Sequence, residues 1–264
     1  MPTKTFMLSI PVLVDQHGLS PHAGTLVELC NLVTALDSIA ADIEGYTTIS
    51  NAVTPFIAAF GFFHGANFLM GCSPNKDIQA SVRDISDRLH RSGKSIFFTS
   101  TPFSTYSFNG RDLATVAGGS TVWMGVGPGT DFAFKTVLDR GYDVIDPNIV
   151  VRPLLLTHPD FMHLDTCFCL LNGGNLMWYP PAFDEHSQNT IRTWFPRAIT
   201  VSDEDANNMA CCAIVMDQNI ITSKISDALA TELASHGYAV SQIDILQHHI
   251  AAGGGCKSLV LEVG

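Results

Sequence analysis

The apolar positions of this chain recur with a helical period in separate stretches, and short apolar runs divide these stretches. Residues 24–42 carry a broad apolar face of that period and residues 77–91 carry a narrower one, so each stretch is predicted to form a helix. A strand pair is predicted within residues 47–70 and a further strand over residues 95–99. The pattern therefore indicates two consecutive helix–strand units.

The rest of the chain continues this alternation. Strands are predicted over residues 120–126, 148–156, 166–171 and 175–179, with a helix over residues 132–141. The last third gives a strand over 213–221, a helix over 223–236 that ends at Gly237, and a strand over 240–245. No long linker and no break in composition interrupts the alternation, so we predict the α/β class, with residues 1–264 in a single domain of several similar units.

The composition is typical of a globular protein. Hydrophobic residues make up 46% of the 264 positions and charged residues 15%, which is enough apolar material for a core. The most apolar stretch, residues 51–72, contains polar residues and Pro55, and it is interpreted as buried strand and turn rather than as a membrane span. No signal or transit peptide is recognised in the N-terminal residues, so a cytoplasmic protein is expected.

The net charge argues against two classes of partner. The chain has 14 Lys and Arg against 25 Asp and Glu, which gives a net charge of −11 at pH 7, and its cations form no basic run. Binding to phosphate groups depends on clustered cations. We therefore expect neither duplex nucleic acid nor an anionic membrane surface as a partner.

The seven cysteines form an odd set without the spacing of a disulfide framework, and we expect reduced, buried thiols. Cys167 and Cys169 would share one face of a strand, but no CxxC motif and no paired-histidine motif completes a ligand set. We therefore expect no metal site.

Two stretches hold residues that could carry chemistry. If residues 163–165 are extended as in a strand, His163 and Asp165 share a face, so an imidazole and a carboxylate would point into the same cavity. Near the C-terminus the glycines 253–255 precede an apolar strand, and a nucleophile at the start of that strand would face a pocket. From the residues alone, a structural role for His163 and an inert role for each cysteine are the favoured interpretations.

Several stretches taken together resemble the guanidino-group-modifying, or pentein, superfamily. They are residues 163–169, 178–184, 202–206, 210–212 and 253–255. The residues are most similar to those of the arginine dihydrolases, in a superfamily that also includes arginine deiminases, dimethylarginine dimethylaminohydrolases and amidinotransferases. The resemblance is strong from about residue 104 to the end of the chain. It implies a five-module α/β propeller around a central polar pocket.

The resemblance also implies a mechanism. A cysteine thiolate attacks the central carbon of a guanidinium group, an amine leaves, and water hydrolyses the covalent amidino intermediate. His163 matches the general acid and base of this scheme. Asp165 matches a carboxylate that holds the guanidinium group, because a carboxylate pairs with that planar fork. No cofactor is implied.

The position of the nucleophile departs from the superfamily pattern. When the glycines and the terminal strand are aligned, Ser258 stands where the superfamily has the catalytic cysteine, and Cys256 lies two residues earlier. Three interpretations remain open at this point. Ser258 could be an engineered replacement for cysteine, or Cys256 could be the nucleophile through a two-residue shift on the same side of the strand. In the third interpretation Ser258 is the natural residue. A hydroxyl is much less acidic than a thiol, so its attack on a guanidinium group would be slow or absent.

Further departures concern the substrate. Asn109 stands where the superfamily has a glutamate that holds the guanidinium group, and Asp112 follows it in the pattern. Asn67 lies in a segment similar to one in the dihydrolases, and residues 127–131 stand where many members have an arginine for a substrate carboxylate. The resemblance implies substrate-binding roles for these side chains, although either asparagine could be a turn residue. The missing charges imply a substrate other than free arginine.

These observations lead to one main hypothesis and two alternatives. We expect a cysteine-type C–N hydrolase that acts on a guanidino compound, or on a related amidine or ureido compound, as its small-molecule substrate. The alternatives are an amidinotransferase of the same superfamily and a non-catalytic small-molecule-binding propeller with a natural Ser258. The sequence leaves homo-oligomer formation open.

Overall fold

The computed structural model of the chain describes residues 5–11, 13–15, 18–20, 23–38, 42–48, 57–98, 107–116, 119–244, 250 and 253–263. Parts of four predicted segments, residues 39–41, 49–56, 99 and 245, lie outside the described residues. Among the described residues, no helix is both long and apolar enough to cross a membrane.

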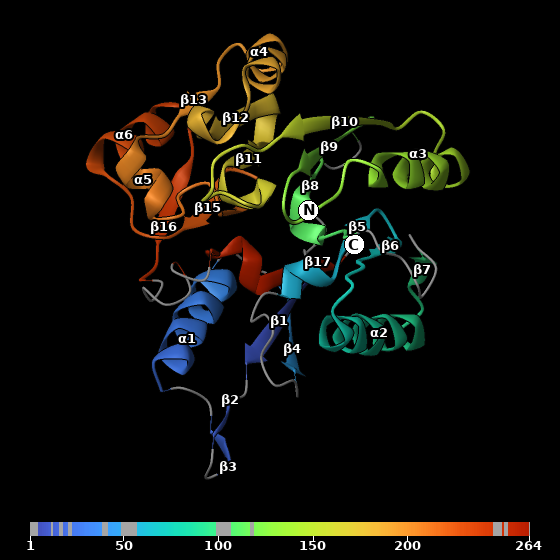
Figure 1. Cartoon of the computed structure of the whole chain (residues 1–264). Coiled ribbons are helices and arrows are strands. Elements are labelled where there is room, and N and C mark those ends of the chain that lie inside the picture. Colours follow the sequence, from blue (N-terminus) through green and yellow to red (C-terminus); the bar gives the residue numbers. More distant parts are fainter. Residues whose placement is uncertain are drawn as a thin grey trace.

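Five three-stranded sheets make up most of the structure, and each repeats one arrangement. In each, a central strand pairs with one neighbour in antiparallel and with the other in parallel orientation. A helix connects the two parallel strands, as parallel pairing requires. Figure 1 shows the five connecting helices at the periphery and the sheets around a common centre. The predicted α/β class with five similar modules is confirmed.

The bounds of the modules follow the order of the chain. The first contains β1 (Thr5–Pro11), α1 (Ala23–Ser38), β4 (Asp42–Thr48) and β17 (Val260–Val263). The second contains β5 (Gly61–His64), β6 (Asn67–Met70), α2 (Lys76–Arg91) and β7 (Ser95–Phe98). The third contains β8 (Leu113–Ala114), β9 (Thr121–Val126), α3 (Phe134–Ile145) and β10 (Val150–Leu155).

The last two modules are formed in the same way. The fourth contains β11 (Phe168–Leu171), β12 (Asn175–Trp178), α4 (Glu185–Trp194) and β13 (Ile199–Thr200). The fifth contains β14 (Ile214–Met216), β15 (Asn219–Thr222), α6 (Asp227–Ser235) and β16 (Ala239–Gln242). Outside the modules lie the hairpin of β2 (Leu13–Asp15) and β3 (Gly18–Ser20) and the short α5 (Asp203–Asn207). Because β17 pairs with β1, the C-terminal strand completes the first module.

The predicted helices are present, with local reasons for their ends. In α2, the apolar face predicted from the sequence is buried, with Val82, Ile85 and Leu89 between 0% and 2% exposed. The side chain of Ser226 accepts a hydrogen bond from the Leu229 N–H and so caps α6 at its N-terminus. Gly237, with φ of 85°, follows the same helix in the left-handed conformation expected of a stop residue.

Two predicted strands differ from the structure. Residues 213–221 form a hairpin rather than one strand, because Asp217 adopts φ of 53° and reverses the chain between β14 and β15. Residues 164–166, placed at the start of a predicted strand, form the 3₁₀ turn η3 (Leu164–Thr166) instead. His163 caps this turn, so His163 and Asp165 do not share a strand face as the alternation pattern suggested.

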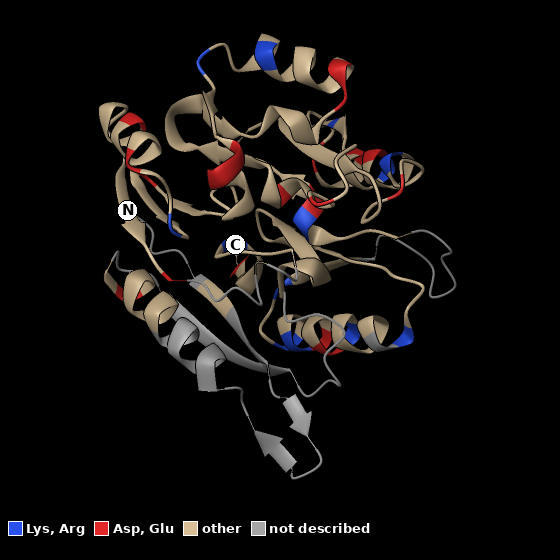
Figure 2. Ribbon diagram, turned by 60° about the vertical axis from the view of Figure 1, so that its left-hand side comes forward, with Lys and Arg blue, Asp and Glu red and all other residues tan. Residues whose placement is uncertain are grey.

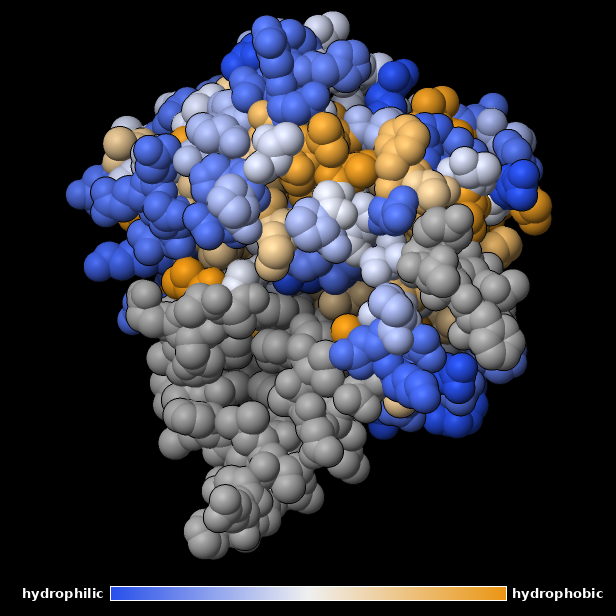
Figure 3. Space-filling view, in the orientation of Figure 1, coloured by the Kyte–Doolittle hydropathy of each residue, from blue (hydrophilic) through white to orange (hydrophobic). Residues whose placement is uncertain are grey.

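Short turns immediately before the first strand of each module point to the centre of the molecule. They include η1 (Ile57–Phe60), η2 (Gly110–Asp112), η3 and η6 (Lys257–Leu259), and each of these contacts at least one of the others. Charged residues lie along the outer helices, among them α2 and α4 (Figure 2). The surface is largely hydrophilic over these helices, with apolar side chains visible between them (Figure 3). The centre is therefore the place where buried polar groups of different modules meet.

Candidate active site

The turns at the centre bring together buried polar side chains from four modules. Arg111 and Asp112 lie in η2, Asp165 lies in η3, Cys212 precedes β14, and Ser258 lies in η6. Each of them is at most 9% exposed. Buried polar groups of this kind are stable only when they pair with one another, and the hydrogen bonds described below provide that pairing.

His163 and Asp112 form the first part of the site. The Nδ1 atom of the imidazole lies 3.2 Å from Oδ2 of Asp112, whose carboxylate also accepts hydrogen bonds from the Thr130 hydroxyl at 2.6 Å and from the Leu164 N–H at 2.9 Å. The ring stays 16% exposed, whereas the carboxylate is almost fully buried. A carboxylate fixed in this way orients the ring, which leaves Nε2 available for proton transfer.

Gly129 lies against the same imidazole ring. A Cβ atom at this position would lie 2.4 Å from Cε1 of His163 and 2.7 Å from Oδ2 of Asp112, both closer than real contacts allow. The backbone can therefore approach the ring only because residue 129 has no side chain. This glycine belongs to the Gly-rich segment in which the superfamily pattern led us to look for an arginine.

Asp165 forms the second part of the site. Its Oδ2 atom accepts hydrogen bonds from Nε of Arg111 and from the hydroxyl of Ser258, each at 2.8 Å. Arg111 also donates from a terminal nitrogen to the carbonyl oxygen of Gly253 at 2.5 Å. Burial, the largest single influence, lowers the pKa of the Arg111 guanidinium, but Asp165, together with Cys212 and Asp112, raises this pKa above its ordinary value overall. Oδ1 of Asp165 is buried and has no hydrogen-bond partner among the described residues.

Cys212 lies beside the hydroxyl of Ser258. Its Sγ atom is 3.0 Å from Oγ of Ser258 and accepts a hydrogen bond from the Gly255 N–H at 3.2 Å. Burial and the charge of Asp165 raise the pKa of this thiol to about 11, although Arg111 acts in the opposite direction. Cys212 is therefore protonated near neutral pH and is not a thiolate nucleophile in this arrangement.

The structure separates Ser258 from Cys256, the two alternatives for the nucleophile. Ser258 contacts Asp165 and Cys212, whereas Cys256 is fully buried in an apolar cluster with Phe6 and Leu36. We expected both side chains on one side of a strand, but residues 257–259 form a 3₁₀ turn, in which positions two apart point in different directions. Within the described residues, the side chain of Cys256 is thus placed in the apolar core rather than with Ser258.

The two predicted asparagines differ in their positions. Asn109 caps η2, where its side chain accepts a hydrogen bond from the Arg111 N–H at 3.1 Å and its own N–H donates to the Thr130 hydroxyl at 3.0 Å. It therefore supports the turn that carries Arg111 and Asp112. Asn67 is half-buried at the start of β6, where it is paired with His64 across the hairpin. In the part of the chain that the structure describes, it makes no recorded contact with the central group.

Three residues of the central group were missed from the sequence. They are Arg111, Thr130 and Cys212, and each contacts a predicted site residue. One feature of the sequence could have indicated Arg111 as a site residue: it is a cation between Asn109 and Asp112, in a segment that otherwise resembles the superfamily. Cys212 lies in residues 210–212, which carry part of the resemblance, but nothing there distinguished its side chain from an ordinary buried cysteine, and Thr130 gave no signal of its own.

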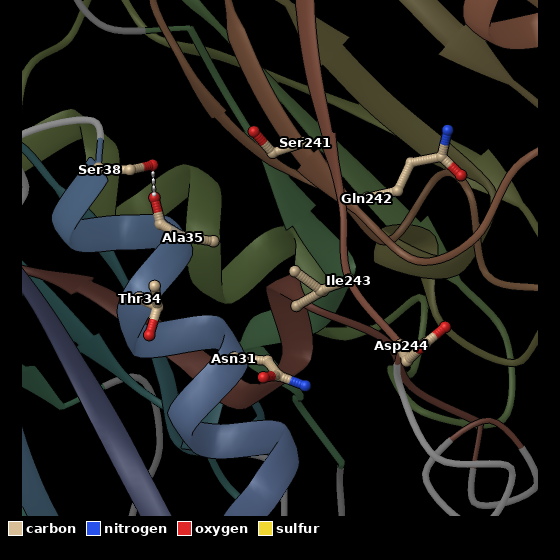
Figure 4. Close-up of a pocket in the computed structure, with 8 residues that line it drawn as sticks. All are labelled: Asn31, Thr34, Ala35, Ser38, Ser241, Gln242, Ile243 and Asp244. Atoms are coloured by element: carbon tan, nitrogen blue, oxygen red, sulfur yellow. Dashed lines mark hydrogen bonds between the residues drawn. The ribbon is translucent and has the colours of Figure 1, made fainter.

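A pocket of about 390 Å³ lies elsewhere, between α1 and the end of β16, and none of the predicted site residues lines it. Figure 4 shows the α1 side chains, among them Asn31 and Ser38, across from residues 241–244. Among the described residues, no group of three or more His, Cys, Asp and Glu side chains is placed to hold a metal ion.

Comparison with known sequences identifies relatives over part of the chain. No family model matches the chain. It is 37% identical over 150 residues to the bifunctional arginine dihydrolase/ornithine cyclodeaminase ArgZ of Synechocystis sp., which covers 55% of the chain and 20% of that protein. It is 31% identical over 113 residues to the N(G),N(G)-dimethylarginine dimethylaminohydrolase of Mycobacterium tuberculosis, covering 43% of the chain and 37% of that protein. The chain spans a fifth to about half the length of the first curated relatives that it matches.

Solved structures match over the full length. The product-bound N-terminal domain of ArgZ, an arginine dihydrolase from cyanobacteria, superposes with a TM-score of 0.85 at 25% identity, over 100% of the chain and 98% of that domain. A cysteine-to-serine variant of that domain bound to its substrate gives a TM-score of 0.83. A cysteine-to-serine variant of the Pseudomonas aeruginosa dimethylarginine dimethylaminohydrolase with citrulline gives 0.79 at 15% identity, over 99% of the chain and all of that protein, a likeness of fold alone.

Proposed function

We propose that the chain is a member of the pentein superfamily of guanidino-group-modifying enzymes, to which it is similar in sequence and fold, and that it hydrolyses a C–N bond of a guanidino compound or of a related amidine or ureido compound. The observation that supports this proposal most is the pair of His163 and Asp112, which lies at the same centre as the group formed by Asp165, Cys212 and Ser258. An oriented imidazole and a buried nucleophile position in the same centre are the groups that covalent hydrolysis needs.

Each residue has a defined step in the proposed reaction. The side chain at position 258 gives its proton to Nε2 of His163 and attacks the central carbon of the substrate, and the bond from that carbon to the leaving amine breaks. His163 gives a proton from Nε2 to the amine, and then removes a proton from the water that attacks the covalent intermediate. The water oxygen bonds to the carbon, the side chain at position 258 is released, and His163 returns to its starting state.

The hydroxyl of Ser258 limits the rate of attack in this scheme, and a cysteine at the same position is expected to raise that rate. The hydroxyl is a much poorer nucleophile than a thiolate near neutral pH, so the chain with Ser258 is expected to bind substrate and turn it over slowly. A cysteine-to-serine variant of the ArgZ domain has been solved with its substrate, which supports retention of substrate in a serine-bearing site of this fold.

A second candidate function is a non-catalytic binding module. The observation that favours it is the hydrogen bond from Ser258 to Asp165, which completes a neutral, buried polar group without a reactive thiolate. In that case Ser258 is the native residue, and the site retains only the ability to hold a small molecule. Transfer of an amidino group to an amine is the remaining alternative, and it differs from hydrolysis only in the acceptor of the second step.

The experiment compares the chain with its Ser258→Cys variant on arginine and a panel of guanidino and ureido compounds. Ammonia release and product mass are measured. We expect turnover by Ser258→Cys at least about 100-fold above the unsubstituted chain, because the thiolate is the stronger nucleophile. In that background Cys256→Ser is expected to change little and His163→Ala to abolish turnover. Absence of turnover in both proteins would leave the binding module as the function.

A further inference from the structure

Arg111 places a guanidinium group of the chain itself at the centre of the site. The residue is 4% exposed, and its Nε atom donates to Asp165 at 2.8 Å. A terminal nitrogen of the same group donates to the carbonyl oxygen of Gly253, which lies 142 residues away in the sequence. Two segments far from Arg111 in the sequence therefore hold this one cation in place, which makes it a fixed feature of the site rather than a surface charge.

Asp165 is the carboxylate that this cation neutralises. Its side chain is 7% exposed, and one of its oxygens, Oδ2, accepts from both Arg111 and Ser258. The other oxygen, Oδ1, is buried and has no partner in the residues that the structure describes. A buried carboxylate oxygen without a donor is costly, so Oδ1 is suited to accept an N–H from a bound molecule.

The charges around Asp165 decide which N–H donor can approach. Arg111 already supplies one full positive charge to this carboxylate. The second carboxylate of the site, Asp112, accepts hydrogen bonds from Thr130 and Leu164 and faces His163. A second guanidinium at Oδ1 would bring two cations together in a buried environment, where repulsion between like charges is strong. An uncharged planar N–H donor avoids this repulsion.

We propose that Arg111 sets the charge of the ligand that this site accepts: its guanidinium takes the place of an external cation on Asp165, so the site selects an uncharged ureido group and rejects a guanidinium. The N–H of the ureido group donates to Oδ1 of Asp165. The inference rests on the proposed function for the identity of the site, but it concerns binding rather than turnover. It therefore makes Arg111 a specificity-determining residue.

The test uses N-propylurea and N-propylguanidinium chloride, which have nearly the same shape and differ in charge. Binding is measured by calorimetry and by the shift of the thermal midpoint, with sodium chloride as the salt control. The unsubstituted chain is expected to bind N-propylurea at least about tenfold more tightly than N-propylguanidinium. Arg111→Met, which keeps the length of the side chain and removes its charge, is expected to reverse this preference. Arg192→Met, at an exposed arginine of α4, is the matched control and is expected to change neither affinity.

Further variants keep the test decisive if Arg111→Met does not fold. Arg111→Lys retains the cation and is expected to continue to reject N-propylguanidinium, and Asp165→Asn is expected to lose binding of N-propylurea. Equal binding of the two probes to the unsubstituted chain would overturn the inference, as would the binding of neither probe. Because no step of the test needs catalysis, it can succeed while the Ser258→Cys variant remains inactive, and it can fail while that variant turns over.

Discussion

The Nδ1 atom of His163 lies 3.2 Å from Oδ2 of Asp112, in a pair that joins the third and fourth modules across 51 positions of sequence. This contact defines which nitrogen of the ring is held and which one is left for a substrate. Asp112, predicted as a substrate-binding residue, thus supports the imidazole in the structure, and its predicted contact with substrate stays a prediction.

We predict that Asp112→Asn lowers turnover by about 10² to 10⁴-fold in the Ser258→Cys background, because the ring loses its orienting carboxylate. The measurement is kcat together with the thermal midpoint, which reports the loss of the hydrogen bonds from Thr130 and Leu164. A variant that keeps the full kcat would show that the carboxylate has no part in orienting the ring.

We predict that Gly129→Ala reduces turnover strongly while the protein stays folded. The added methyl group would lie 2.4 Å from the His163 ring and must displace it. Gly127→Ala is the matched control, since its methyl group would lie 3.3 Å from Leu156, where a small adjustment suffices. Activity and circular dichroism of the two variants are compared. Equal activity of both would contradict the close approach at position 129.

We predict that removal of either partner of the Arg111–Asp165 pair destabilises the protein by about 3 to 5 kcal/mol, because the other charge is left buried. The double variant Arg111→Met, Asp165→Asn is expected to cost less than the sum of the two single variants. Urea denaturation of the four proteins measures the coupling. Strict additivity would mean that the two side chains do not stabilise one another.

We predict that the free energy of unfolding falls as pH rises from about 9 to about 11. Burial raises the pKa of Cys212 from its ordinary value of 9.0 to about 11, so in this window the unfolded chain loses the thiol proton before the folded chain does. Below pH 9 the thiol is protonated in both the folded and the unfolded state, so it does not change the free energy of unfolding as the pH varies. The loss is on the order of 1 to 2 kcal/mol for this thiol, and Cys212→Ala is expected to show a shallower decline. An identical decline in that variant would exclude Cys212 as its source.

The same burial predicts chemical behaviour of Cys212. At pH 7.5 the folded protein is expected to leave this thiol unmodified by iodoacetamide, while the protein unfolded in urea reacts. Peptide mass spectrometry after each treatment locates the label. Rapid labelling of Cys212 in the folded state would contradict its buried, protonated form.

Local patterns in the sequence predicted the elements, and long-range pairing determined the site. The apolar period of α2 was sufficient because burial of Val82, Ile85 and Leu89 follows from that period alone. The turn at Asp217 could not be predicted, because aspartate adopts a positive φ only where the surrounding fold favours it. An alternation pattern likewise gave no sign that η3 and η6 are 3₁₀ turns.

The site residues also divide into those that local sequence patterns indicate and those that only long-range contacts bring together. The sequence motifs indicated His163, Asp165 and position 258, because these residues stand in local strings that the superfamily shares. The contact of Arg111 with Asp165 joins positions 54 apart and its contact with Gly253 joins positions 142 apart, and no local spacing encodes either contact. Cys256 was attractive in the sequence for its proximity to Ser258, and the turn directs it into the apolar core instead.

The most direct test of the proposed covalent mechanism is the mass of the Ser258→Cys protein quenched during turnover. The account predicts a mass increase equal to one amidino or one carbamoyl group, located by peptide mapping at position 258, and no adduct when His163 is also replaced by alanine, because His163 protonates the leaving amine. The carbamoyl mass is the one expected if Arg111 selects a ureido substrate. Product formation without any adduct, or an adduct at Cys256 or Cys212 instead, would contradict the account.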